Sequence, residues 1–111
     1  MSALVESITK QASILSDAEN HLKVAIGRYN TVKGLDGQQG YKVTINGVTV
    51  EVAEMDRHYY PKLIRGREMI HLGALKALDA EIDHWRARVK VEAGMLALCA
   101  ERLAKFAKGE A

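Results

Sequence analysis

Residues 41–52, Tyr-Lys-Val-Thr-Ile-Asn-Gly-Val-Thr-Val-Glu-Val, constrain the fold of this chain more than any other stretch. Asn46-Gly47 separates two alternating apolar segments, and these residue types suit the positive φ angles of a two-residue type I′ turn. The turn sets the strand pairs Ile45–Val48, Thr44–Thr49, Val43–Val50, Lys42–Glu51 and Tyr41–Val52. One face of this hairpin then carries Tyr41, Val43, Ile45, Val48, Val50 and Val52. Because an isolated hairpin is marginal in water, helices or another subunit must cover that face.

Helical periodicity flanks the hairpin on both sides. Apolar residues recur at coiled-coil-like spacing over about 2–32 and again over about 61–108. A Gly-rich connector at 34–40 and a turn at 53–60 join these helices to the hairpin. We therefore predict a mainly α, coiled-coil-like helical hairpin around a central two-stranded antiparallel β-hairpin. A kink or break near Gly73 is the alternative for the second helix, and a break there or near Gly94 would give a three-helix bundle.

Composition limits the broad class of this protein. The 111 residues fit one domain, 1–111, and the apolar (48%) and charged (27%) fractions are those of a globular protein. With a formal charge of only +2, nucleic-acid binding would need a local basic patch. Cys99 is the only cysteine, and the sequence shows neither a signal peptide nor a membrane-spanning apolar run. We expect a soluble cytoplasmic protein without membrane association.

The lengths of the two helical segments suggest that the second projects beyond the first. If the helices fold back directly across the hairpin, Leu22 lies near His71, Leu15 near Leu78 and Ile8 near Trp85, and His21 also comes near His71. About one-third of the second helix then remains uncovered, and its apolar stripe favours a homo-oligomer. The predicted interface combines the hairpin face with Trp85 and this stripe: Tyr41, Val43, Ile45, Val48, Val50, Trp85, Leu96, Cys99, Leu103 and Phe106.

Residues 57–71 form the segment with the most chemically distinctive composition. Arginine, lysine, histidine and tyrosine side chains gather there near the start of a helix, a combination that could hold a phosphate, a nucleotide or single-stranded nucleic acid. The candidate ligand-binding residues are Arg57, His58, Tyr59, Tyr60, Lys62, Arg65, Arg67 and His71. The alternative is a solvated helix entrance whose tyrosines cap the core.

No motif for catalysis, a cofactor or a metal is apparent. The four histidines lack metal-ligand spacing, no Gly-rich phosphate loop is present, and no catalytic residues can be assigned. Glu19 and Glu92 place charges in the helix seams, where such residues often specify register or partner. We therefore expect a protein that is not an enzyme and needs no cofactor.

The order helix, central hairpin, helix, with seam periodicity on both sides, resembles the β-class subunit of prefoldin. That resemblance implies hairpins that assemble into a β-barrel platform and coiled coils that hold unfolded client proteins. The long apolar seam without catalytic motifs and the composition of 57–71 lead to two predicted functions. The first is a protein-binding module acting as an oligomeric chaperone, adaptor or small inhibitor. The second is binding of a phosphate-bearing ligand through 57–71.

Overall fold

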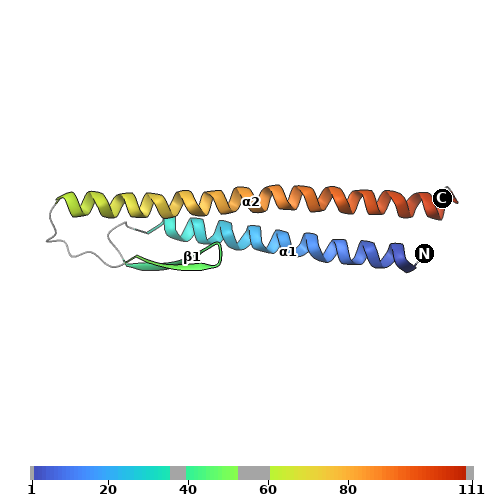
Figure 1. Cartoon of the computed structure of the whole chain (residues 1–111), viewed down its shortest axis with the longest axis horizontal. Helices are drawn as coiled ribbons and strands as arrows, with labels where there is room; N and C mark the ends of the chain where they lie inside the picture. Colours follow the sequence, from blue (N-terminus) through green and yellow to red (C-terminus); the bar gives the residue numbers. More distant parts are fainter. Residues whose placement is uncertain (1, 36–39, 53–60, 110–111) are drawn as a thin grey trace. The chain divides into compact units, whose positions relative to one another are not determined.

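Two long helices flank a β-hairpin in this protein (Figure 1). The structure is a computed structural model that describes residues 2–35, 40–52 and 61–109, with side chains for 3–35, 40–52 and 68–109. Its elements in chain order are α1 (Ser2–Lys33), β1 (Tyr41–Ile45), β2 (Val48–Val52) and α2 (Pro61–Ala107). The predicted mainly α architecture is confirmed, whereas the predicted turn at 53–60 lies outside the described residues.

The hairpin has the predicted register, with all five strand pairs in place from Tyr41↔Val52 to Ile45↔Val48. Asn46 and Gly47 have φ angles of 51° and 78°, as a type I′ turn requires. α2 is a single helix that runs through Gly73 and Gly94, so the break and the three-helix bundle are absent. Neither helix, in the part of the chain that the structure describes, has a stretch long and apolar enough to cross a bilayer.

Two glycines are expected to respond in opposite directions to replacement by alanine. Gly47→Ala should lower the free energy of unfolding by about 1–2 kcal/mol, because a Cβ is disfavoured at positive φ. Gly73→Ala should raise it by about 1 kcal/mol, because glycine is a poor helix former and a Cβ there meets no heavy atom within 4 Å. Urea unfolding followed by circular dichroism measures both changes. A loss of stability in both variants would contradict the assignment of Gly73 to an open helix position.

The packing divides the chain into two units, and both helices contribute to each of them. We call Met1–Lys23 with His84–Ala111 the helix-pair unit and Val24–Asp83 the hairpin unit. The hairpin unit therefore stands as an insertion in sequence between the two halves of the helix-pair unit.

The hairpin unit has its own apolar core. One face of β1 packs with α1 and α2 around Leu78, which is completely buried. The buried cluster consists of Val32, Val43, Ile45, Ala74 and Leu78. Val48 shares the predicted apolar face of the hairpin, yet it is 64% exposed, because β2 is covered less than β1 at the turn end of the hairpin.

A buried carboxylate attaches the hairpin turn to α2. Glu81 is only 6% exposed, and its Oε2 accepts a hydrogen bond from the backbone N–H of Asn46 at 3.4 Å. The Arg28 guanidinium lies 3.7 Å from Oε1 of the same carboxylate. A buried charge needs compensating donors, so the hydrogen bond from Asn46 holds the hairpin turn beside Glu81 on α2.

The predicted alignment of the two helices is wrong. Leu78 packs with Val32 in the hairpin unit, and Trp85 packs with His21 in the helix-pair unit. The predicted alignment pairs the helices starting from the end of α1 and the beginning of α2, which adjoin the hairpin in sequence. Instead, the hairpin packs against residues 71–81 of α2, and α1 meets α2 further along the chain. The predicted uncovered third of α2 is therefore absent, and Leu96, Cys99 and Leu103 are half-buried.

Candidate functional site

Most of the predicted ligand-binding segment falls where the structure gives no side chains. Arg57, His58, Tyr59 and Tyr60, together with the side chains of Lys62, Arg65 and Arg67, lie outside the described residues. His71 is described, and its Nδ1 lies 2.9 Å from the Tyr41 hydroxyl, with the two rings edge to face. His71 thus takes part in holding the hairpin against α2, while phosphate binding by the segment stays a prediction.

The predicted interface residues divide into covered and exposed groups. Val43 and Ile45 are buried in the core of the hairpin unit, and Tyr41 and Val50 pack partly against it. In the helix-pair unit, Trp85 is half-buried like Leu96, Cys99 and Leu103, and Phe106 is 42% exposed. The interface between chains stays a prediction for this set, whose hairpin members other than the exposed Val48 already pack within one chain.

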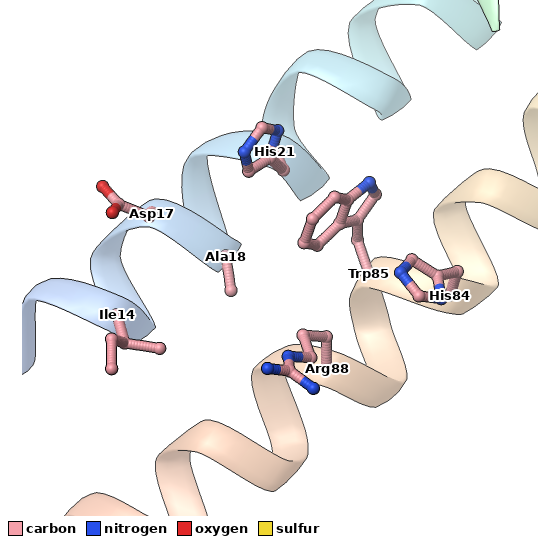
Figure 2. A pocket seen from close by; sticks show the side chains of 7 residues that line it. All are labelled: Ile14, Asp17, Ala18, His21, His84, Trp85 and Arg88. Carbon is pink, nitrogen blue, oxygen red and sulfur yellow. The ribbon is translucent and has the colours of Figure 1, made fainter. Parts of the chain in front are cut away.

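A pocket lies between the two helices of the helix-pair unit, and its wall includes the rings of His21, His84 and Trp85 (Figure 2). Its volume is about 360 Å³. We call it the aromatic pocket; its described lining residues are Ile14, Asp17, Ala18 and His21 from α1 with His84, Trp85 and Arg88 from α2. The α1 residues recur at spacings of three and four, which places them on one helix face.

The Trp85 indole contacts two other rings of this pocket. The His21 ring stacks on the indole, with centroids 4.3 Å apart and planes only 9° from parallel. His84 meets the same indole edge to face at 5.0 Å. Figure 2 shows the carboxylate of Asp17 pointing away from α2. The indole is therefore held in one orientation by two imidazoles, one from each helix.

A buried polar network lies next to the pocket. Glu92 is 7% exposed, and its Oε2 accepts a hydrogen bond from Nε2 of Gln11 at 2.5 Å. The same amide nitrogen donates to the backbone carbonyl of Glu92 at 3.1 Å, and Nη2 of Arg88 lies 3.2 Å from Oε1. Glu92 thus positions Arg88 at the rim of the aromatic pocket and joins α2 to α1. That a seam charge such as Glu92 specifies the register of the helices stays a prediction, and Glu19, the other predicted seam charge, is exposed.

Exposed apolar side chains continue from the pocket along α2. Val91, Met95 and Leu98 are 57%, 48% and 51% exposed, and their spacing of four and three places them on one helix face. We call these three residues the apolar row. It begins three residues after Arg88, so the pocket and the row adjoin each other on the helix-pair unit.

No protein-family model, curated protein or solved structure matches this chain.

The described lining of the aromatic pocket combines aromatic, charged and apolar side chains. Its described lining residues offer an indole, two imidazoles, a guanidinium and a carboxylate, with no hydroxyl, thiol or amine nucleophile. Among the residues that the structure describes, no three His, Cys, Asp or Glu side chains gather as a metal site requires. Rings and guanidinium groups of this kind are common at the energetic centres of protein interfaces.

The sequence places Trp85 in a predicted interface and near Ile8, but does not connect it with His21 or Ile14. The two segments are far apart in the chain, and the seam periodicity repeats every seven residues, so it does not single out one alignment. The spacing of Val91, Met95 and Leu98 along one helix face can be read from the sequence. The row lies beside the seam of Leu96, Cys99 and Leu103, and spacing alone does not say which of two neighbouring rows is covered.

Proposed function

We propose that this protein is a non-enzymatic protein-binding module, an adaptor that docks an amphipathic helix of a partner protein on the helix-pair unit. The observation that carries this proposal is the exposure of the apolar row on a helix that already packs against α1 through a different seam. A helix with apolar residues over so wide an arc is typical of a bundle in which it has more than one helical neighbour.

The free energy available from burying the apolar row indicates how much further surface a partner must contact. Each side chain of the row gains roughly 1.5–3 kcal/mol on full burial, and about half of that remains available because each is about half exposed. The total of roughly 2–5 kcal/mol corresponds to millimolar affinity at best, before the cost of association. A specific partner must therefore also fill the aromatic pocket, where Trp85 and Arg88 provide the residue types found at interface hot spots.

Charges at the two ends of the row indicate the chemistry of the partner. Arg88 precedes the row, and Arg102 follows it four residues after Leu98 on the same face. A partner helix with apolar residues at its centre and acidic residues at both ends would complement this surface. An antiparallel second copy centred on Met95 would instead bring Arg88 near the other copy's Arg102, which disfavours that arrangement.

A matched pair of double variants tests the proposal. Met95→Gln/Leu98→Gln removes the row, and Met69→Gln/Leu72→Gln makes the same substitutions, at the same spacing, at exposed positions in the other half of α2. The tagged full chain and both variants are used to retain proteins from a native lysate, with quantification by mass spectrometry. We expect specific partners to be lost with Met95→Gln/Leu98→Gln and kept with Met69→Gln/Leu72→Gln.

Sedimentation velocity at micromolar concentration measures self-association of the same three proteins. If two copies of the chain associate and only Met95→Gln/Leu98→Gln dissociates them, the row forms a homo-oligomer and the adaptor proposal is wrong. If all three proteins are monomers and retain the same proteins, the row is not a binding surface and the proposal fails. Circular dichroism checks that each variant is folded, which we expect for substitutions at exposed positions.

A further inference from the structure

The hairpin presents unpaired backbone groups along the outer edge of β1. In an antiparallel ladder, opposed residues alternate between pairs that exchange hydrogen bonds and pairs that do not. The two-residue turn makes Ile45↔Val48 a hydrogen-bonded pair, and Val43↔Val50 is the next one. Lys42 and Thr44 therefore direct their N–H and C=O groups away from β2. The sheet has two strands in the part of the chain that the structure describes, so no strand there pairs with this edge.

A groove follows the same edge. We call it the β1-edge groove; it is lined by Lys42, Val43 and Thr44 of β1 and by Gly27, Arg28, Thr31, Val32 and Leu35 from the end of α1 and just beyond it. Its volume is about 390 Å³. Successive strand residues point to opposite faces, so a groove that touches three in a row lies along the backbone edge. Gly27 leaves its α1 wall open, since a Cβ there would meet no heavy atom within 4 Å.

The lining residues specify a ligand chemistry. Lys42 is exposed, and the Arg28 side chain is 35% exposed although its guanidinium also lies 3.7 Å from Glu81. None of the described lining residues is acidic. Leu35, which is half-buried, supplies apolar surface to the groove, while Val32 and Val43 behind it are buried in the core. A ligand that pairs with the free backbone N–H and C=O groups of β1 must be extended. To complement the side chains of the groove, the same ligand must carry acidic residues beside an apolar one.

We propose that the hairpin unit binds an extended, acidic segment of a partner protein, which adds to β1 as a third strand. Lys42 and Thr44 supply two N–H donors and two C=O acceptors to the segment, and Lys42 and Arg28 face its carboxylates. Strand addition of this kind takes its affinity from main-chain hydrogen bonds and its specificity from alternate side chains. The site lies in the hairpin unit and does not depend on the apolar row or the aromatic pocket.

A random eight-residue peptide display library, selected on the full-length chain, provides the probe. We expect enrichment of peptides with acidic residues at alternate positions and without proline at the centre. The most enriched peptide, synthesised with a fluorescent label, then gives affinities by fluorescence anisotropy. No enrichment, or enrichment without acidic residues, would overturn the proposal.

The cross-strand pair Thr44↔Thr49 offers a matched control. Both N–H groups face an outer edge of the hairpin, where proline is tolerated, but only Thr44 faces the groove. Thr44→Pro should weaken peptide binding at least about tenfold, because it removes a donor and blocks close approach, while Thr49→Pro should leave affinity within about twofold. Full binding by Thr44→Pro would contradict strand addition at β1.

Two further variants keep the test independent of hairpin folding. Gly27→Leu fills the groove from α1 and should abolish binding, so wild-type affinity in this variant overturns the proposal even if both proline variants unfold the hairpin. Lys42→Glu should shift the selected peptides from acidic to basic sequences. Met95→Gln/Leu98→Gln should bind the peptide like the wild type, which separates this site from the helix-docking surface.

Discussion

Leu78→Ala is expected to lower the free energy of unfolding by about 2–5 kcal/mol, the largest loss among the single substitutions considered. Leu78 has no exposed surface and lies at the centre of the cluster that joins α1, β1 and α2 in the hairpin unit. Its truncation removes apolar surface and leaves a cavity, because the helices and the hairpin that surround it relax only in part. Urea unfolding monitored by circular dichroism measures the change.

Leu72→Ala is the control for this prediction, with the same substitution on the same helix at a side chain that is 57% exposed. It should change stability by no more than about 0.5 kcal/mol. Equal effects of the two substitutions would show that Leu78 is not at the centre of the core. A loss confined to Leu78→Ala would confirm that the hairpin, α1 and α2 share one core.

Gln11→Leu is expected to destabilise the protein by about 1.5–3 kcal/mol, the usual size of a hydrogen bond to a charged group. Gln11 donates to Oε2 of Glu92, which is almost completely buried. Loss of the amide leaves the carboxylate with Arg88 as its remaining charged partner. A leucine at this seam position cannot compensate, because the buried charge keeps its cost of desolvation.

The double variant Gln11→Leu/Glu92→Leu should recover most of that loss, since an apolar pair can replace a buried polar one. A double-mutant cycle in urea therefore yields a coupling energy of about 1–3 kcal/mol between the two positions. Glu101→Gln serves as the control, because Glu101 forms an exposed ion pair with Lys105 and should change stability by less than about 0.5 kcal/mol. Simple additivity of the two leucine substitutions would contradict a coupled pair.

The local elements of this fold could be predicted because local chemistry specifies them. Asn46 and Gly47 supply the two positive φ angles of the turn, and that turn fixes every strand pair. The seam periodicity gives helices whose observed ends lie within one residue of the predicted ones. In each case, residues close together in sequence contain all the information needed.

The alignment between the helices could not be predicted in the same way. A heptad seam looks alike at each repeat, so apolar spacing does not say which turn of α1 faces Trp85. The contacts that distinguish one alignment from another are polar and distant in sequence, such as Gln11 with Glu92 and Arg28 with Glu81. Since the aromatic pocket depends on that alignment, it could not be assembled from the sequence either.

The division of the chain has a consequence for the order of folding. The helix-pair unit is made of two segments, and the whole hairpin unit lies between them in sequence. Closing a flexible loop of that length costs conformational entropy before any contact between the segments is gained. If residues 24–83 fold first, α1 and α2 are already held together where Arg28 meets Glu81, and the remaining helix turns can associate by zippering. Early folding of the hairpin unit would therefore lower the entropic cost of bringing the two segments of the helix-pair unit together.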